Sequence, residues 1–596
     1  MSRKMFYGSN SFIGLEEAIE AVTADSDDDR AYDLAIIPPD PSVVTDEEEG
    51  SDEEEGSDED MVTYTLPRDV PGNIEVLVHD EDTLLSDYDS SDEEPLASKR
   101  VRRQPNIEQR QQTPAWRKCL PSYTFGHQHT SEVQDKQNAI KEQLKDQNPV
   151  QIFEKILDEE VLQLILCNSI LYANQNNIHS FQLDLPDLKK FIGIFILSGY
   201  HKLPREALYW SLDEDVGVAL VSRAMSRNKF REIKRYLHLV NNDEASNSRD
   251  KMFKIRSLAD ILMTKFNQWG VFHENISIDE SMVKYYGHHP SKQFIRGKPV
   301  RFGYKNWVAA SFTGYCYKFD FYCGKSLYSS DEPLGTRVVK SLLSKLDTDP
   351  KNHKVFFDNF FTSCNLLFDL RNLGYCAGTV RENRTKKCPL AAIKEMKKKE
   401  RAAFDYSFDI NNELLLVRWK DNSVCTIATN YDYFEPMGTV KRWCPEMRQK
   451  TDVRIPLLFE NYNKGMGGVD ELDQSISLYR IGNHGKKRWW VLFTYLLDMA
   501  VSNSWRLHVM SKDDPMDQLL FRRSLARYYL RQETLKRARP SSSLIEGLPQ
   551  DGSSHYPRKL EKQLRCVICH ARVRWECKKC LKTLCVEKSC FEKFHT

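Results

Sequence analysis

The sequence has no long apolar run. Among its 596 residues, no stretch of about 18 or more apolar residues suggests a membrane span, and no early apolar segment resembles a secretory signal. Cysteines are also sparse except at one place, because nine of the fifteen are scattered and six lie in the last 31 residues. We therefore expect no membrane anchoring, and reduced thiols in a reducing compartment.

The formal net charge of −1 conceals a strong polarity. Residues 1–98 hold 30 acidic and 4 basic residues, a net charge of −26, which leaves 81 basic and 56 acidic residues and a net charge of +25 in the remainder. A basic body of this size favours a polyanion partner, because phosphate contacts supply most nonspecific DNA affinity. The alternative is a solvated surface with a basic bias.

Residues 1–125 are predicted to form a disordered acidic head and a basic linker. The run Asp46–Asp60 is almost entirely acidic and has no helical or strand period, so it cannot bury enough apolar surface to fold. The head could mask the basic body or simply keep the chain soluble. The cluster Ser98–Arg103 that follows it is typical of nuclear import signals and of phosphate-binding patches, and we expect a nuclear protein.

Two apolar strands each end in an acid. Helical periodicity over residues 126–272 changes near residue 273 to strand patterns, and Ile276–Ile278 is followed by Asp279. A later strand, Lys354–Phe357, is followed by Asp358. A hairpin followed by an αβαβ pattern is typical of ribonuclease-H-like folds, so we expect the two strands to be adjacent and the two acids to meet.

A third acidic motif lies in a predicted helix. Asp470 follows a glycine pair, and Asp473 lies three residues further on, so both side chains share one helix face. Glycines are expected to let the chain turn tightly before this helix. Carboxylates are the ligands that Mg²⁺ prefers, and two ions can clamp a phosphate displacement. The alternative is an acidic first turn that favours the helix dipole.

The chain resembles the piggyBac family of DDE/D DNA transposases over most of residues 130–596. The resemblance is carried by the stretches SIDE, RGKPVRFGYK, FDNFFTS, GTVREN and YNKGMGGVDELDQ. It implies that Asp279, Asp358 and Asp470 hold two Mg²⁺ ions as the catalytic triad, and that Asp473 also matters for activity. It further implies excision through DNA hairpins, integration at TTAA sites, and a homodimer that joins two double-stranded transposon ends.

The resemblance also implies a multidomain α+β architecture with a ribonuclease-H-like α/β core interrupted by a β-rich insertion. We expect the following segments: a helical dimerisation and DNA-binding domain at 126–272 and 481–540, core parts at 273–383 and 456–480, an insertion domain at 384–455, a linker at 541–563, and a zinc domain at 564–596.

Two basic segments are candidate DNA contacts. In the insertion, Lys397–Lys399 and Arg401 could bind phosphates, although a solvated charged face explains them nearly as well. Beyond Asp473, Lys486–Arg488 precede two tryptophans that could stack on a distorted DNA end. Packing against the core is the preferred interpretation of Trp490, and both interpretations stay open for Trp489.

The C-terminal cysteines have metal-ligand spacing. Paired Cys-x2-Cys turns present two thiolates to one ion, and seven ligands suit two Zn²⁺ ions in a cross-braced arrangement whose pairing stays open. His570 is a possible eighth ligand. The candidate ligands are Cys566, Cys569, Cys577, Cys580, Cys585, Cys590 and His595. The spacing between Cys585 and Cys590 and the terminal histidine depart from the insect prototype of the family. DNA or a chromatin protein is the expected partner of this domain.

The sequence thus predicts a nuclear, Mg²⁺-dependent cut-and-paste transposase. Two other readings of the chain stay open. One is a domesticated descendant that binds DNA or chromatin without transposing, and the other is a structure-selective repair nuclease that shares the chemistry and differs in substrate.

Overall fold

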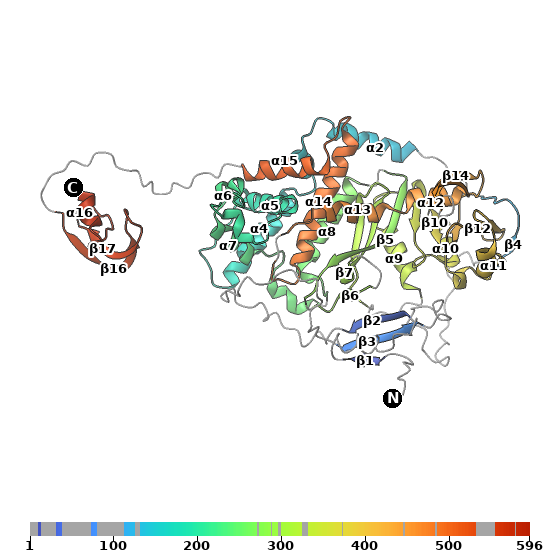
Figure 1. Cartoon of the computed structure of the whole chain (residues 1–596), viewed down its shortest axis with the longest axis horizontal. Helices are drawn as coiled ribbons and strands as arrows, with labels where there is room; N and C mark the ends of the chain where they lie inside the picture. Colours follow the sequence, from blue (N-terminus) through green and yellow to red (C-terminus); the bar gives the residue numbers. More distant parts are fainter. Residues whose placement is uncertain are drawn as a thin grey trace. The chain divides into compact units, whose positions relative to one another are not determined.

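The chain folds into two compact units, Met1–Gln532 and Glu533–Thr596, and each is described by itself (Figure 1). The computed structural model describes residues 10–12, 31–37, 73–79, 113–124 and 131–595, except 532–554 and short gaps at 249, 271–272, 288, 296–299, 325–331, 372–373, 445–447, 483–484 and 579. No helix in these ranges has the length and apolarity that crossing a membrane requires.

Four described strands lie within residues 1–125, the segment predicted to be disordered, and the last of them, β4 (Trp116–Arg117), belongs to the central sheet. β1 (Asn10–Phe12), β2 (Ala31–Ile37) and β3 (Asn73–His79) form an antiparallel sheet in the order β1-β3-β2. The prediction of disorder throughout residues 1–125 is therefore wrong for these segments; the apolar and β-branched residues of β2 and β3 favour strands. The acidic run 46–60 and the basic cluster 98–103 lie outside the described residues. Their predicted roles therefore stay predictions.

A helical layer is built from two distant stretches of the chain. Several of its helices begin at a side-chain cap: the carboxylates of Asp158 and Asp184 and the hydroxyl of Ser226 each accept a backbone N–H bond at a first turn. α14 (Trp490–Ser511) packs on α3 and α8, and α15 (Gln518–Leu530) packs on α5. The earlier elements are α2 (Ser131–Leu144), α3 (Pro149–Phe153), α4 (Glu159–Gln175), α5 (Leu185–Tyr200), η3 (Glu206–Trp210), α6 (Ala219–Ala224), α7 (Arg227–Tyr236), η4 (Asn242–Asn247) and α8 (Phe253–Gln268).

The centre of the main unit is a large mixed sheet (Figure 1). Its order is β4-β11-β12-β13-β10-β9-β5-β7-β6, with β8 beside β7; β5, β9 and β10 run parallel, and the other pairs are antiparallel. The strands are β4 (Trp116–Arg117), β5 (Asn275–Lys284), β6 (Lys292–Phe294), β7 (Phe302–Ser311), β8 (Cys316–Phe321), β9 (Lys354–Phe357), β10 (Tyr375–Thr379), β11 (Phe404–Asp409), β12 (Leu414–Lys420) and β13 (Val424–Thr429).

The segment predicted as an insertion does not form a sheet of its own throughout. β11, β12 and β13 extend the central sheet, because β13 pairs with β10 from Ala377 to Thr379. Only β14 (Gly438–Cys444) and β15 (Gln449–Ile455) form a separate ribbon. The remaining elements of the unit are α9 (Leu334–Leu343), η5 (Pro350–Asn352), α10 (Cys364–Leu370), η6 (Glu382–Arg384), α11 (Ile393–Lys398), α12 (Leu457–Gly465) and α13 (Gly468–Leu478).

The C-terminal unit is small. It contains β16 (Pro557–Arg565), which pairs with β17 (Arg572–Cys577), and α16 (Cys590–His595). β16 begins inside the segment predicted as a linker at 541–563, so the folded unit starts earlier than expected. The strand was not predicted because every residue of β16 except Leu560 is exposed, so its sequence carries no apolar alternation.

Candidate active site and metal centre

Asp279 and Asp358 lie side by side at the centre of the sheet. β5 and β9 pair in parallel, with Ile276 opposite Val355 and Ile278 opposite Phe357. The next residue on each chain is an aspartate, so the register places Asp279 and Asp358 at the same level. Corresponding residues of adjacent parallel strands are about 5 Å apart and point to the same face. The expected adjacency of the two strands is present, but β5 continues to Lys284, so Asp279 lies within its strand and not at the predicted end, because β5 goes on pairing with β7.

α13, which carries the exposed Asp470 in its first turn, packs against β5. The side chain of Ser277 on β5 donates a hydrogen bond to the carbonyl oxygen of Met466, just before α13. Further along β5, the Oγ atom of Ser281 donates to Oδ1 of Asp473, at 2.6 Å. Ser277, Asp279 and Ser281 alternate along one strand and share one face. The face that carries Asp279 is therefore joined to the α13 segment on both sides of Asp470.

Glycine allows α12 and α13 to approach the sheet closely. A Cβ atom on Gly465 would overlap the ring of Phe356, and one on Gly468 would overlap the carbonyl oxygen of Ser311. Neither glycine has a positive φ angle, and Gly467 has open space around its Cα atom. The predicted reason, a tight turn, is therefore wrong: the two flanking glycines are needed for packing, and Gly467 is not.

Both aspartates of the sheet are oriented by the backbone. Oδ1 of Asp279 accepts the N–H of Glu280 at 2.8 Å, and Oδ1 of Asp358 accepts the N–H of Phe360 at 2.9 Å. Asp279 is 9% exposed. Burial raises the pKa of the Tyr462 hydroxyl, and the charges of Asp358 and Asp279 raise it further. The two carboxylates and Tyr462 of α12 thus share one electrostatic environment.

The donor set of this site fits hard divalent cations. It would consist of carboxylate oxygens from β5, from the residue after β9 and from α13, and Mg²⁺ prefers oxygen ligands. Within the described part of the chain, these acids do not form a group of three whose oxygens all lie within 4.8 Å of one another. Two catalytic ions lie about 3.5–4 Å apart, so acids that bind different ions need not meet that criterion.

Asp473 differs from the other three acids in its partner. Its Oδ1 atom accepts the hydroxyl of Ser281, which in turn lies 2.9 Å from the hydroxyl of Tyr495 on α14. Ser281 and Tyr495 are buried. Neither residue was singled out in the sequence, because a serine and a tyrosine on apolar elements carry no motif.

The C-terminal unit brings eight ligand atoms into two groups. One group is Cys566, Cys569, Cys585 and Cys590, and the other is His555, Cys577, Cys580 and His595. In each group the ligand atoms all lie within 4.8 Å of one another, as a tetrahedral ion requires. The two groups alternate in pairs along the chain, which is the cross-braced order expected from the sequence.

The candidate eighth ligand is His555 and not His570. Nδ1 of His555 lies 3.2 Å from Sγ of Cys580 and 3.4 Å from Sγ of Cys577, whereas His570 is exposed and belongs to neither group. His555 was missed because it precedes the first Cys-x2-Cys turn by eleven residues, within the predicted linker. Pairing it with the later cysteines requires the β16–β17 hairpin, which the spacing did not predict.

Local hydrogen bonds prepare two of these ligands. Nδ1 of His595 lies 2.7 Å from the carbonyl oxygen of Phe591, which leaves Nε2 facing the metal group. Burial acts to raise the pKa of the Cys566 thiol, but backbone N–H groups of Cys569, Ile568 and Cys585 lower it to about 6. A thiolate, the form that binds metal, is therefore favoured at neutral pH.

The tryptophans proposed to stack on DNA are part of the core. Trp489 is 7% exposed and Trp490 is 1% exposed, and the Trp490 ring meets that of Phe195 edge to face. Nζ of Lys487 donates to the carbonyl oxygens of Arg235 and Leu237. Packing is thus the correct reading of both rings.

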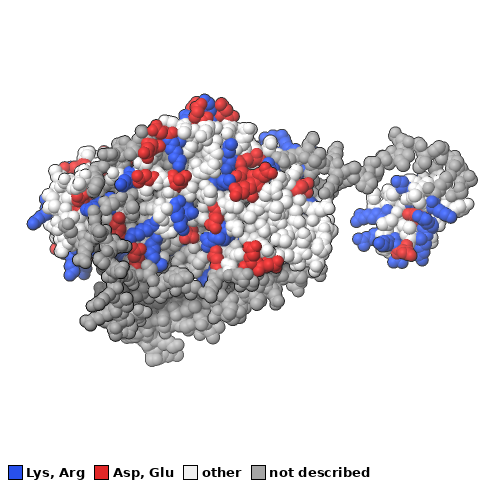
Figure 2. Space-filling model, turned by 180° about the vertical axis from the view of Figure 1, so that it is seen from behind, with Lys and Arg blue, Asp and Glu red and all other residues white. Residues whose placement is uncertain are grey.

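Basic side chains are distributed unequally. Arg401, a candidate phosphate contact, is instead paired with Asp421, while Lys397, Lys398 and Lys399 are exposed. On the face shown in Figure 2, positive and negative side chains of the main unit are interspersed, whereas positive ones gather on the C-terminal unit. The exposed cations of its hairpin include Arg558, Lys559, Lys562, Arg565, Arg572 and Arg574.

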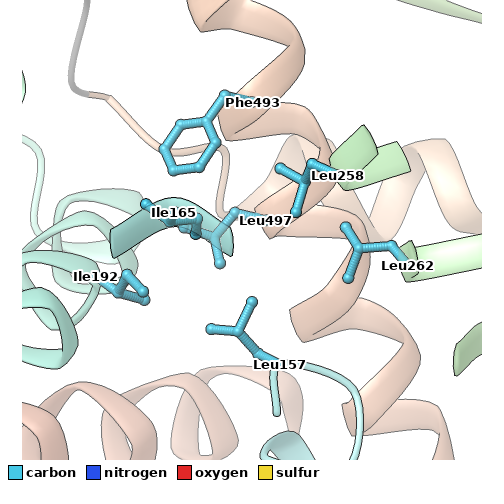
Figure 3. Close-up of a pocket in the computed structure, with 7 residues that line it drawn as sticks. All are labelled: Leu157, Ile165, Ile192, Leu258, Leu262, Phe493 and Leu497. Carbon is cyan, nitrogen blue, oxygen red and sulfur yellow. The ribbon is translucent and has the colours of Figure 1, made fainter. Parts of the chain in front are cut away.

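The helical layer contains a small apolar pocket (Figure 3). Its side chains come from α4, α5, α8, α14 and the segment before α4, and none offers a polar atom. Such a lining has no group that could orient a polar ligand, so the pocket is a packing gap of the core. It is lined by Leu157, Ile165, Ile192, Leu258, Leu262, Phe493 and Leu497.

Comparison with known proteins decides the family. Residues 148–505 match a family model described as Transposase IS4. The chain is 36% identical over 457 residues to human PiggyBac transposable element-derived protein 3, covering 75% of this chain and 76% of that protein. This chain belongs to the piggyBac transposase family. A human relative, PiggyBac transposable element-derived protein 2, is 35% identical over 463 residues, covering 76% of this chain and 78% of the relative.

The fold agrees with a solved piggyBac structure. A chain of the cryo-EM structure of the piggyBac transposase synaptic complex with hairpin DNA matches with a TM-score of 0.53 at 20% identity, covering 74% of this chain and 95% of that chain. The predicted family and mixed α/β architecture are therefore confirmed. Asp279, Asp358, Asp470 and Asp473 all lie within the segment matched by the family model.

Proposed function

We propose that this piggyBac-family chain cleaves and joins DNA strands at a two-Mg²⁺ site held by Asp279, Asp358 and Asp470 in a ribonuclease-H-like core. The observation that carries the proposal is the β5–β9 register, which aligns two acids that lie 79 residues apart in sequence. Joining of α13 to the same strand face supports Asp470 as the third ligand.

In this mechanism the protein side chains hold the metal ions in place and do not themselves transfer protons. Bound Mg²⁺ ions would activate water and then a 3′ hydroxyl for attack on phosphorus, and would stabilise the leaving oxygen. Asp279 and Asp358 present oxygens from a rigid sheet, and their backbone N–H bonds limit rotation of each carboxylate. Pre-orientation of this kind lowers the reorganisation needed in the transition state, so no side-chain general base is required.

The proposal includes the partners and location expected of such an enzyme. The chain would act in the nucleus as a homodimer that joins two transposon ends and inserts them at TTAA. The C-terminal unit would hold two Zn²⁺ ions and present its cationic hairpin to DNA. Its exposed arginines and lysines suit phosphate contacts, which position a protein without reading sequence.

A second candidate function is a descendant that binds DNA or chromatin and no longer transposes. It is favoured by the printed names of the similar human proteins, which are described as derived from transposable elements. The two candidates share the fold and differ in strand cleavage.

Excision of a plasmid reporter in cells tests the proposal. The reporter carries the DNA that flanks the gene as its ends, and wild type is compared with Asp358→Asn. Removing one electrostatic element of a reaction centre typically costs about 100- to 1000-fold in rate, so the variant should lose excision. It should still bind DNA, because the substitution leaves the cationic surfaces unchanged.

Excision that restores TTAA in wild type alone would support the triad and the target. Equal excision by Asp358→Asn would contradict the triad. Absence of excision by a folded, nuclear, DNA-binding wild type would favour the second candidate, and chromatin occupancy would then be measured.

A further inference from the structure

A buried hydrogen-bond chain links α13, which carries Asp470, to β5, which carries Asp279, and to α14 of the helical layer. It runs from Tyr495 on α14 through Ser281 on β5 to Asp473 on α13, with O···O distances of 2.9 and 2.6 Å. Ser281 is fully buried, and Tyr495 is 3% exposed. Burying a polar group costs free energy unless the group forms hydrogen bonds, and here the three side chains supply them to one another.

The direction of the chain follows from the number of available protons. An ionised Asp473 only accepts hydrogen bonds, so the single hydroxyl proton of Ser281 is committed to it. The Tyr495 hydroxyl must then donate to Ser281 Oγ. Burial raises the pKa of Tyr495, and the charge of Asp473 raises it further, so this hydroxyl keeps its proton. The bond to the carboxylate is charge-assisted, and therefore the strongest of the chain.

The chain lies directly beside the proposed metal ligands. Ser281 is two residues after Asp279 on one face of β5, a separation of about 7 Å along the strand. Asp473 is three residues after Asp470, less than one turn along α13. At the other end of the contact between β5 and α13, the hydroxyl of Ser277 donates a hydrogen bond to the carbonyl oxygen of Met466. Asp279 and Asp470 therefore sit between two fixed points that join the same strand and helix.

We propose that Asp473 is a positioning residue, which Ser281 and Tyr495 hold so that α13 presents Asp470 to Asp279 and Asp358. This inference rests on the proposed function, and it gives Asp473 a role different from that of a metal ligand. It also makes α14, a helix of the helical layer, a direct support of the active site.

Two substitutions at Asp473 separate the roles. The side-chain oxygen of the Asp473→Asn variant still accepts the Ser281 hydroxyl. Asp473→Ala removes the acceptor, so one of the two protons of the buried Ser281 and Tyr495 hydroxyls has no acceptor left in the hydrogen-bond chain. Positioning predicts that Asp473→Asn keeps cleavage within about 10-fold of wild type, and that Asp473→Ala loses at least about 10- to 100-fold, as supporting residues of metal sites do. A metal ligand would lose activity in both variants, as Asp470→Asn should.

Direct binding of Mn²⁺, followed by electron paramagnetic resonance in the full chain without DNA, supplies a readout independent of turnover. Tyr495→Phe and Ser281→Ala should raise the half-saturating Mn²⁺ concentration about 10-fold. Tyr209→Phe is the matched control, because it removes another buried tyrosine hydroxyl, bonded to the carbonyl oxygen of His201 and distant in sequence from the three motifs. It should leave Mn²⁺ binding unchanged.

The outcomes separate this inference from the proposed function. Wild type that binds Mn²⁺ through Asp279 and Asp358, with Asp473→Asn as impaired as Asp470→Asn, overturns the positioning role alone. The positioning role is also overturned if Tyr495→Phe changes the half-saturating Mn²⁺ concentration as little as Tyr209→Phe does. Wild type that shows no Mn²⁺ binding dependent on Asp279 overturns the proposed function, and the positioning role with it. Thermal melting of each variant identifies loss of fold, and Tyr495→Phe, which removes one oxygen atom, is the variant that keeps the shape of the core.

Discussion

The two candidate metal sites are built in opposite ways. In the main unit, the acids are held by strands and a helix whose packing involves large apolar side chains, so the site exists because the sheet exists. In the C-terminal unit, four of the five most buried side chains are themselves candidate ligands: Cys566, Cys577, Cys585 and Cys590, beside Leu584. A sheet can hold its acids in place without a metal, whereas the small unit has little else to hold it. In the main unit, metal is expected to take part in the reaction without being needed for the fold. In the C-terminal unit, metal is expected to hold the fold together.

Metal removal should separate the two regions most sharply. A zinc chelator should unfold the C-terminal unit and leave the main unit folded, because structural Zn²⁺ contributes an apparent 10–16 kcal/mol or so in peptides of this kind. Limited proteolysis is the measurement: residues 555–595 should become sensitive while a fragment spanning 131–531 persists. Equal resistance of both regions after chelation would show that the comparison is wrong.

Loss of one histidine should halve the metal content of the C-terminal unit. His555→Ala removes one ligand of the mixed Cys and His group, so the bound zinc should fall from two ions per chain to one. His570→Ala is the matched control, since His570 is exposed and outside both groups, and should keep two. Native mass spectrometry counts the ions. Two ions in the His555 variant would contradict the ligand assignment.

A single methyl group should disturb the main unit through packing alone. Gly468→Ala places a Cβ atom against the carbonyl oxygen of Ser311, so α13 must move away from β7, at a cost of about 1–3 kcal/mol. Gly467→Ala meets nothing within 4 Å and should be neutral. Urea unfolding of both variants measures the difference. If the two behave alike, close approach of α13 to the sheet is not required.

The smallest expected effect is a pH dependence confined to the main unit. Burial, with the charges of Lys487 and Lys254, lowers the pKa of His238 to about 2. Below pH 6.5 the unfolded chain binds a proton that the folded chain does not, so stability is full above this pH and falls as the pH decreases toward 2. The loss from this residue should be about 1 kcal/mol between pH 7 and 5.5.

His238→Phe keeps a ring to stack on Tyr172 and should remove that part of the slope. Unfolding free energies of wild type and variant at pH 7 and 5.5 provide the measurement. An unchanged slope would mean that His238 is not buried in its neutral form.

Sequence reading succeeded where local patterns coincide with structure. Asp279 and Asp358 each follow a short apolar strand segment, and parallel pairing of those segments needed only the αβ order of the elements between them. The continuation of β5 past Asp279 to Lys284 was not predicted. The placement of Cys566 and Cys569 in one candidate group follows from turn spacing. These features depend on neighbours along the chain, so they are visible without coordinates.

It failed where the cause lies across the chain. The extension of the sheet by β11–β13 depends on pairing with β10, and the role of Gly468 depends on a carbonyl oxygen of β7. His555 joins cysteines more than twenty residues away. The pairing of Arg401 with Asp421, twenty residues further along the chain, was likewise not visible in the sequence.

The alternating ligand order of the C-terminal unit has a consequence for how it loads metal. His555 and His595 belong to one group, so a single ion would join the first and last ligands and close the unit into a ring of about forty residues. The other ion binds entirely within that ring. Closing the ring reduces the conformational entropy of the chain between the two histidines. The inner ligands then lose less entropy when they bind their ion, so binding of one ion should raise the affinity for the other. Zinc titration should therefore be cooperative, with few chains carrying only one ion.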